Sequence, residues 1–324
     1  MTLSILADIG GTNTRVALAK GPNVLEHSVA RFANADYKAR GQDIADILVD
    51  YLKTSGDAVS GVCVAAAGPV QDGVASMTNL DWVIDAEKLR SATGATHTAI
   101  LNDLQAQGQA LGHIAPTKLR PIIDGPKAPG AMLVVGLGTG VNAAPVHGTG
   151  AARLVPPSEC GHVNMPVRSE SDLALMRFVE SRLAAAGEVA HCGVEEVLSG
   201  RGLITLHAFA AAQAHEPAAT TSAQVFADLD KGHPVATHAA TLYTRILAQT
   251  LADLALIHLP YGGIYLIGGM ARAMTPHFAR LGLTEHFRET RRVDLLENDF
   301  SVTVVEDDFA ALTGCAAYLH AQIG

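Results

Sequence analysis

Two short runs of alternating apolar and polar residues open the chain, and a polar turn that contains glycine joins them. The alternation within residues 3–19 predicts a pair of β-strands, because successive side chains of a strand point to opposite faces. The same arrangement returns at residues 131–146, where apolar runs flank a Gly-Leu-Gly-Thr-Gly turn at 136–140. Two such hairpins far apart in one chain predict a duplicated α/β architecture with a cleft between its halves.

The remaining periodicities predict strands and helices between and after the hairpins. Apolar residues at a period of 3.6 predict an amphipathic helix near 44–52, and continuous apolar runs predict buried strands. A segment rich in glycine and proline, residues 116–130, separates the two halves. The other expected elements are strands at 61–67, 98–101, 263–267 and 301–306, and helices at 105–112, within 170–258 and at 309–323.

Composition supports two folded domains and narrows the class of partner. A chain of 324 residues exceeds the size at which one core usually stops growing, and 48% hydrophobic with 17% charged residues allows a large core. The formal net charge of −9 argues against a nucleic-acid-binding surface. The chain begins directly with a predicted strand and has no apolar run that could cross a bilayer, so we expect a cytoplasmic protein without a membrane partner.

The cysteines are scattered, which fits a reducing compartment. They stand at positions 63, 160, 192 and 315, and no C-x-x-C spacing occurs. Cys160 and His162 could be combined with His191 and Cys192 into a zinc site, but the usual paired spacing is missing. We therefore expect no structural zinc.

The turn at residues 8–13 has the composition of a phosphate-binding hairpin. Its successive glycines remove the Cβ atoms that would keep an anion away, so backbone N–H groups, the Thr12 hydroxyl and the Asn13 amide can point at phosphate oxygens. Asp8, at the end of the first strand, is placed to face a cation that accompanies the phosphate. Neither the Walker spacing nor the dinucleotide fingerprint occurs, and an ordinary Gly-Gly hairpin turn is the alternative interpretation.

A third glycine pair and an acidic residue follow other predicted strands. Gly268 and Gly269 would let a flat ligand approach the backbone closely. Asp103 also follows a strand, and open α/β sheets bind ligands beyond the carboxyl ends of their strands. A carboxylate there can accept the proton of a hydroxyl that attacks a terminal phosphate. The alternative is that Asn102 and Asp103 only cap the helix that follows.

Three further side chains have the chemistry to bind a polyol. Glu159 and His162 flank a glycine in a segment bounded by prolines, and both can hydrogen-bond to hydroxyl groups. Glu195 adds a carboxylate in a Val-Glu-Glu-Val-Leu-Ser-Gly stretch at 194–200. The alternative interpretations are a surface loop with two unrelated polar residues for the first pair, and stabilisation of a helix dipole for Glu195.

Short stretches in order along nearly the whole chain resemble the bacterial glucokinases of the hexokinase and actin-like superfamily. The set is specific, because a chance match to one stretch is common and an ordered joint match is not. The zinc motif typical of the related repressor-and-sugar-kinase group is missing after His162, which favours the glucokinase branch. The matching stretches are Asp8-Ile9-Gly10-Gly11-Thr12-Asn13, Met77-Thr78-Asn79 with Trp82, Asn102-Asp103, Gly136-Leu137-Gly138-Thr139-Gly140, Glu159-Cys160-Gly161-His162-Val163, Glu195-Glu196-Val197-Leu198-Ser199-Gly200 and Ile267-Gly268-Gly269.

The resemblance implies a ribonuclease H-like, duplicated actin-like or hexokinase-like fold and a role for each motif. The C-terminal helix would return to the N-terminal domain, so that residues 1–113 and 306–324 form a small α/β domain and residues 114–305 a large one, with a cleft between them. Asp103 would be the catalytic base. The sugar would be held by Asn79, Asn102, Asp103, Glu159, His162 and Glu195. ATP would be held by Asp8, Gly10, Gly11, Thr12, Asn13, Gly138, Thr139, Gly268 and Gly269, with Mg²⁺ near Asp8 through water.

The expected function is transfer of the γ-phosphoryl group of ATP to the 6-hydroxyl of glucose, a reaction of glycolysis. A kinase for fructose, mannose or N-acetylglucosamine would keep every motif, so the choice of sugar stays open, as do polyphosphate as donor and a homodimer. A sugar-sensing regulator is disfavoured, because no helix-turn-helix precedes Leu3. Two stretches depart from the family pattern: residues 307–314 replace an Asn-Pro-Gly-Leu-type run, and Cys160 stands where glycine is common.

Overall fold

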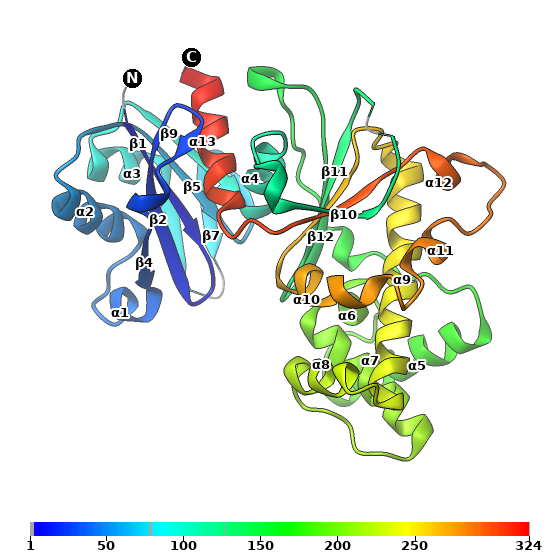
Figure 1. The fold of residues 1–324 in the computed structure, drawn as a ribbon. Helices are drawn as coiled ribbons and strands as arrows, with labels where there is room; N and C mark the ends of the chain where they lie inside the picture. The colour runs from blue at the N-terminus through cyan, green and yellow to red at the C-terminus, as the bar shows by residue number, and fades with distance from the viewer. Residues whose placement is uncertain (1–2, 78–79, 127, 324) are drawn as a thin grey trace. The chain divides into compact units, whose positions relative to one another are not determined.

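The chain folds into two compact units, which Figure 1 draws as ribbons. The structure is a computed structural model that describes residues 3–77, 80–126 and 128–323. Unit 1 comprises Met1–Lys118, Val146–Pro157 and Asp307–Gly324, and unit 2 comprises Leu119–Pro145 and Ser158–Glu306. Residues 146–157 group with unit 1, whereas the resemblance assigns them to the large domain; the boundaries at 113 and 306 stay a prediction.

Unit 1 is built on a mixed β-sheet. Its described residues form six strands in the order β3-β2-β1-β5-β9, with β4 also paired to β2. The hairpin strands β1 and β2 are antiparallel, and β1, β5 and β9 run parallel. The predicted N-terminal hairpin and the strands near 61–67 and 98–101 are therefore confirmed. The strands are β1 (Leu3–Ile9), β2 (Asn13–Lys20), β3 (Asn23–Val24), β4 (Ala30–Ala33), β5 (Val59–Ala66) and β9 (His97–Asn102).

Helices cover both faces of this sheet, because apolar side chains of β1 point alternately to one face and the other. Ile5 and Ile9 pack in one cluster with apolar residues of α2 and α3, whereas Leu6 packs in another with α4 and α13. The predicted amphipathic helix α2 begins at a capping box formed by Asp43 and ends at Gly56, whose φ is 73°. The helices of unit 1 are α1 (Asn34–Lys38), α2 (Ile44–Ser55), α3 (Ala86–Thr93), α4 (Asp103–Ala110) and α13 (Ala310–Ile323).

The C-terminal helix α13 lies unusually close to α4. A Cβ atom built on Gly314 would lie 1.6 Å from the carbonyl oxygen of Ala106, so only glycine permits this approach. Just before the helix, the buried carboxylate of Asp307 accepts hydrogen bonds from Lys118 Nζ (3.0 Å) and from the backbone N–H of Phe309 (3.1 Å). Residues 307–314, which depart from the family pattern, thus anchor α13 within unit 1.

A small antiparallel sheet in unit 1 was not among the elements that the sequence predicted. It consists of β6 (Val70–Gln71), β7 (Val74–Met77) and β8 (Trp82–Asp85). Asp72 and Gly73 form the β6–β7 turn with φ values of 51° and 77°, a left-handed conformation typical of Asp-Gly hairpin turns. Asn79, one of the predicted sugar ligands, lies outside the described residues.

Unit 2 repeats the strand order of unit 1. Its described residues form a five-stranded sheet in the order β10-β14-β13-β11-β12, in which β11, β13 and β14 run parallel and β10 is antiparallel to β14. The series β12-β11-β13-β14 corresponds to β2-β1-β5-β9, which confirms the duplicated α/β architecture. The strands are β10 (Leu119–Ile123), β11 (Met132–Leu137), β12 (Val141–Val146), β13 (Ile264–Ile267) and β14 (Val302–Val305).

A helical layer packs on the sheet of unit 2 and supplies most of its core. The longest helix, α9, buries residues on all sides, including Tyr243, whose hydroxyl donates to the carbonyl oxygen of Leu198 (2.8 Å). The predicted helix-rich region 170–258 is confirmed. The helices are α5 (Glu170–Ala185), α6 (Glu195–Leu198), α7 (Gly200–Ala214), α8 (Ser222–Asp230), α9 (Pro234–His258), α10 (Gly269–Phe278), α11 (Leu283–Phe287) and α12 (Leu295–Asn298).

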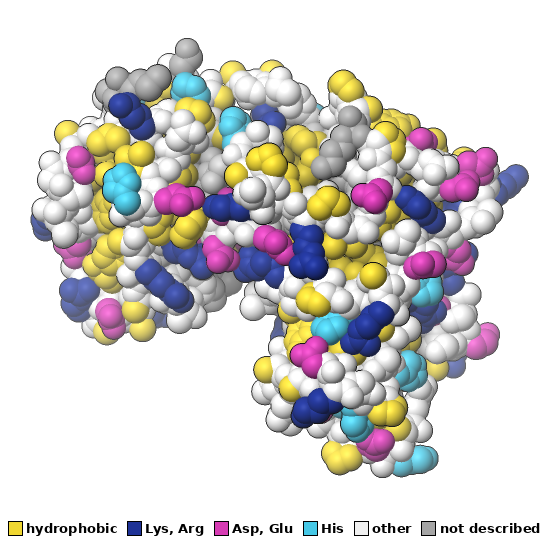
Figure 2. All heavy atoms as spheres, viewed as in Figure 1, with side chains coloured by type: hydrophobic (Ala, Val, Ile, Leu, Met, Phe, Trp, Pro, Cys, Tyr) yellow, Lys and Arg dark blue, Asp and Glu magenta, His cyan; other side chains and the backbone are white. Residues whose placement is uncertain are grey.

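The surface carries both signs of charge. Figure 2 shows acidic and basic side chains interspersed on the face in view. Within the part of the chain that the structure describes, every helix is too short or too polar to cross a bilayer.

Candidate active site

A buried asparagine, Asn34, supports the β1–β2 turn through hydrogen bonds. Asn34 donates from Nδ2 to the carbonyl oxygen of Gly10 (2.8 Å) and from its backbone N–H to the carbonyl oxygen of Thr12 (3.0 Å). Its own Oδ1 accepts from Thr14 Oγ1 (2.7 Å). Residues 10–12 are exposed above this support. The glycine turn is therefore fixed in shape by contacts on its inner side while its outer side can meet a ligand.

Asp8 lies at the carboxyl end of β1, beside the turn. Its Oδ2 accepts from Arg15 Nη1 at 3.1 Å, and the Asp8 side chain is 18% exposed. Burial raises the pKa of Asp8 above its ordinary value, and the Arg15 charge and hydrogen bond oppose that shift. Because burial disfavours the ionised form of Asp8, a second cation nearby would stabilise the negative charge of its carboxylate. Asp8 thus fits a hydrated divalent cation, the chemistry that the sequence predicts for it.

Asn102 and Asp103 stand at the junction of β9 and α4. Asn102 caps the helix: its Oδ1 accepts from Leu104 N (3.0 Å), and its backbone N–H donates to Gln105 Oε1 (3.0 Å). Asp103 is the first residue of α4, and its half-buried carboxylate accepts from the same Leu104 N–H at 2.8 Å. The positive end of the helix dipole favours negative charge at this position. Both side chains therefore contribute to the cap of α4, and this contact is compatible with a catalytic role for Asp103.

Glu159 and His162 are presented by one tight turn in unit 2. The turn is fixed by Asn142 of β12, whose Oδ1 accepts from the backbone N–H of Cys160 (3.1 Å) and from Ser158 Oγ (3.3 Å). The Asn142 amide also donates to the carbonyl oxygen of Ser158. Glu159 and His162 are both exposed. Asn142 therefore holds the backbone from which these candidate sugar ligands project.

Glu195 lies beside this turn because glycines leave room for it. Its Oε2 accepts from the backbone N–H of Val141 (2.9 Å), and its Oε1 pairs with Arg201 at 3.0 Å. A Cβ atom on Gly140 would lie 2.8 Å from Glu195 Oε2, and one on Gly161 would lie 2.1 Å from the carbonyl oxygen of Val141. Because its partners lie on β12 and α7, Glu195 does more than stabilise the dipole of its own short helix. The structure thus brings together the candidate polyol ligands of unit 2.

A pocket of about 690 Å³ in unit 2 is lined by residues of the second and third glycine motifs. Three helices begin at it among the residues described: α7, α8 and α10 each contribute their first and fifth residues to its wall. The Gly138 carbonyl accepts from Gly200 N (2.9 Å), which ties the β11–β12 turn to α7. The lining residues are Gly138, Thr139, Gly200, Arg201, Ile204, Thr220, Thr221, Ser222, Phe226, Gly269, Met270 and Ala273.

The walls of this pocket suit a ligand with a flat apolar part and an anionic part. Ile204, Phe226 and Met270 give it an apolar side, and the positive dipole ends of the three helices that begin at it favour an anion. The α10 start has no side-chain cap. Its N-cap, Gly268, has φ 109°, and a Cβ there would lie 2.3 Å from the carbonyl oxygen of Leu137. Glycine at 268 therefore lets α10 begin directly against β11, beside Gly269 in the pocket wall.

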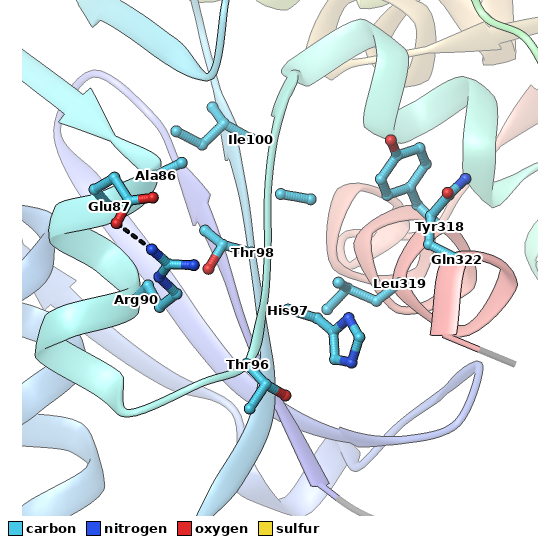
Figure 3. Close-up of a pocket in the computed structure, with 11 residues that line it drawn as sticks. Ala86, Glu87, Arg90, Thr96, His97, Thr98, Ile100, Tyr318, Leu319 and Gln322 are labelled. Carbon is cyan, nitrogen blue, oxygen red and sulfur yellow. Dashed lines mark hydrogen bonds and ion pairs between the residues drawn. The ribbon is translucent and has the colours of Figure 1, made fainter.

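Another pocket, of about 460 Å³, lies in unit 1 beside the open edge of β9. Figure 3 shows Glu87 and Arg90 of α3 on one side and Tyr318, Leu319 and Gln322 of α13 on the other. It borders residues 96–100, the amino-terminal part of the strand, whereas Asn102 and Asp103 lie at the carboxyl end. This pocket is therefore distinct from the predicted site.

The cysteines near the polyol ligands behave as packing residues. Burial raises the pKa of Cys192 to about 12, so its thiol stays protonated at neutral pH and contacts Met165. His191 Nε2 lies 3.0 Å from the carbonyl oxygen of His162, to which it donates when protonated. Among residues 3–77, 80–126 and 128–323, no group of three His, Cys, Asp or Glu side chains is arranged to hold a metal ion.

Comparison with known proteins decides the family. The family model described as Glucokinase matches residues 5–322. The chain belongs to the glucokinase family. It is 29% identical to a glucokinase of Brucella abortus over 97% of this chain and 90% of that protein, and 32% identical to a glucokinase of Pseudomonas paraeruginosa over 88% and 82%. A solved glucokinase from an Antarctic psychrotroph superposes with a TM-score of 0.86 at 25% identity, covering 99% of both chains.

Membership of the glucokinase family makes this protein an ATP:hexose 6-phosphotransferase and confirms the resemblance.

Some of the residues that build the candidate site were not found by sequence reasoning. Asn34 and Asn142 support turns from a distance in the sequence, and Arg201 pairs with Glu195 while lining the pocket. The Ser-Gly-Arg-Gly run at 199–202 was the available signal for Arg201, since it follows a predicted site residue at a helix start.

Proposed function

We propose that this member of the glucokinase family transfers the γ-phosphoryl group of ATP to the 6-hydroxyl of glucose. The observation that carries the proposal is the pocket at the starts of α7, α8 and α10, which offers an apolar wall for a base and the positive ends of three helix dipoles for phosphates. Gly138, Thr139, Gly268 and Gly269, the nucleotide ligands predicted in unit 2, line this pocket or lie directly beside it.

The hairpin of unit 1 would supply a second set of groups for the phosphates. Gly11, Thr12 and Asn13 would donate backbone and side-chain hydrogen bonds, since the Asn34 support leaves the outer side of the turn exposed. The N–H of Gly10 donates to the carbonyl oxygen of Asn13 (3.0 Å), so Gly10 would contribute by letting the phosphate approach closely. Mg²⁺ bound with the nucleotide would neutralise charge on the phosphates, and Asp8 would hold it through water.

Asp103 would act as the general base. Its carboxylate accepts the proton of the sugar 6-hydroxyl as that oxygen bonds to the γ-phosphorus, and the bond to the oxygen bridging β- and γ-phosphorus breaks, which leaves ADP and glucose 6-phosphate. The hydrogen bond from Leu104 N–H fixes the carboxylate at the start of α4.

The remaining sugar hydroxyls would be held by Asn102, Glu159, His162 and Glu195. Asn102 already donates from Nδ2 to the carbonyl oxygen of Gly68 (2.9 Å), and its Oδ1 accepts from the backbone N–H groups of Leu104 and Gln105, so its second amide hydrogen is the group that would reach the sugar. Glu159 can only accept when ionised, and His162 donates or accepts according to its tautomer.

A panel of sugars tests the proposal. We expect glucose to give the highest kcat/KM when ADP release is measured with glucose, fructose, mannose and N-acetylglucosamine at matched concentrations. A preference for another member of the panel would replace glucose as the substrate and keep the reaction. ADP release that never exceeds the sugar-free rate would contradict the kinase proposal and favour a sugar-sensing protein without catalysis.

Asn142 gives a second prediction about the sugar site. Replacing it by Ala removes the hydrogen bonds that hold the Glu159 turn, so we expect the dissociation constant of glucose to rise about tenfold, the equivalent of one or two net hydrogen bonds. Isothermal titration calorimetry measures this. Ser76→Ala, a change at an exposed position in β7 of unit 1, is the control and should leave glucose affinity unchanged.

A further inference from the structure

Arg201 contacts a candidate sugar ligand and also forms part of the candidate nucleotide pocket. Its guanidinium pairs with Glu195 Oε1 at 3.0 Å, and the same residue lines the pocket beside Gly138 and Thr139. The Arg201 side chain is 69% exposed, whereas that of Glu195 is 19% exposed. The more exposed partner of this ion pair is therefore the arginine, which stands in the first turn of α7.

We propose that Arg201 is a positioning residue that couples nucleotide binding to sugar binding by exchanging Glu195 for phosphate oxygens. The proposal rests on the function proposed above and adds a route of communication to it. Without nucleotide, the Arg201 guanidinium forms an ion pair with Glu195 Oε1. With nucleotide, it turns to the phosphates, and Oε1 becomes available to a sugar hydroxyl.

The exchange is favourable because of what each partner offers. A guanidinium carries five N–H donors in a planar fork, and a polyphosphate presents several anionic oxygens in place of one carboxylate oxygen. The pair with Glu195 is exposed on the arginine side, and such pairs contribute little stability because water competes with them. Little is therefore lost when the arginine leaves.

Glu195 keeps its place when Arg201 leaves, because a separate contact holds it. The backbone N–H of Val141 donates to Oε2 at 2.9 Å, and Gly140 and Gly161 provide the space for the carboxylate. The released Oε1 thus belongs to a carboxylate that is already oriented. A sugar hydroxyl then donates to an oxygen that no longer shares its charge with a guanidinium.

Linkage makes the effect reciprocal and measurable. If nucleotide strengthens sugar binding by some factor, sugar strengthens nucleotide binding by the same factor, and such couplings are typically about 5- to 150-fold. We expect the wild-type protein to bind glucose about two- to fivefold more tightly in the presence of a saturating magnesium complex of a non-hydrolysable ATP analogue, because the strength of the exposed ion pair limits the gain.

The test is calorimetric titration of the full chain with the ATP analogue and with glucose, each alone and in the presence of the other. In Arg201→Gln we expect analogue affinity to fall about tenfold and the coupling factor to approach one, because a charge-assisted hydrogen bond is lost. Arg201→Lys keeps the charge without the fork and should restore part of both. Arg177→Gln, the same change at an exposed position on α5, is the matched control.

The outcomes separate this inference from the proposed function. If Arg201→Gln keeps the analogue affinity and the coupling factor of the wild type, Arg201 has no such role although the kinase proposal stands. Equal loss of glucose affinity with and without analogue would show a merely structural effect on Glu195 and would also overturn the inference. A wild-type protein that binds neither ligand would overturn both.

Discussion

Replacing Asp103 by Asn is expected to lower kcat by about 10²- to 10⁴-fold, the usual contribution of a positioned general base. Asn keeps the shape of the side chain and can still accept from Leu104 N–H, so the start of α4 is preserved. Sugar affinity should therefore change little, and the loss should fall on turnover. A coupled assay of ADP release gives kcat, and calorimetric titration with glucose gives the dissociation constant.

Asp36→Asn is the matched control for this change. Asp36 is an exposed acidic residue in the first turn of α1, also in unit 1, so the variant makes the same chemical substitution at another helix start. We expect wild-type kcat in the control. A wild-type kcat in the Asp103 variant as well would show that the base is another group.

Replacing Gly314 by Ala is expected to destabilise unit 1 by about 3 kcal/mol or more. Glycine to alanine in a helix normally adds about 1 kcal/mol of stability, so propensity alone predicts the opposite sign. The new methyl group would lie 1.6 Å from the carbonyl oxygen of Ala106, and backbone atoms cannot rotate away. The helices α4 and α13 would have to separate, which opens the core that they share with the sheet.

The single tryptophan makes this change measurable in unit 1 alone. The sequence contains 1 tryptophan, and Trp82 is buried in β8 of unit 1. Its emission during urea unfolding therefore reports the unit that holds α4 and α13. Thr313→Ala, at the neighbouring half-buried position, should change the free energy of unfolding by less than about 1 kcal/mol. A Gly314→Ala protein as stable as this control would contradict the packing interpretation.

The sequence predicts the elements whose periodicity extends over a full strand or helix, and it misses shorter ones. The strands β6, β7 and β8 have two to four residues, too few to establish a period. The Asp72-Gly73 dipeptide, a hairpin signal, was present but unused. The segment 116–130 was interpreted as a separator because of its prolines and glycines, yet β10 lies in it. Pro121 is tolerated there because β10 is an edge strand of its sheet.

The candidate site divides in the same way between local and distant signals. Glycine turns and strand ends are local features, so residues such as Gly138 and Asp103 can be found from the sequence. Asn34 supports a turn 24 residues away, and Asn142 supports one 18 residues away. No local pattern marks either asparagine, because its role depends on strand pairing. Convergence of α7, α8 and α10 on one pocket likewise depends on how the helices pack.

The features by which the pocket of unit 2 would bind an anion also limit what it would accept. Arg201 and the starts of three helices line it, and the field of a helix start acts only within about one helical turn. The outer surface carries an excess of negative charge, since the chain has a net charge of −9. A long polyanion such as RNA would meet repulsion before it reached the helix starts, whereas the single nucleotide proposed for this pocket would reach them. An acidic protein can thus remain selective for mononucleotides among the polyanions of a cell.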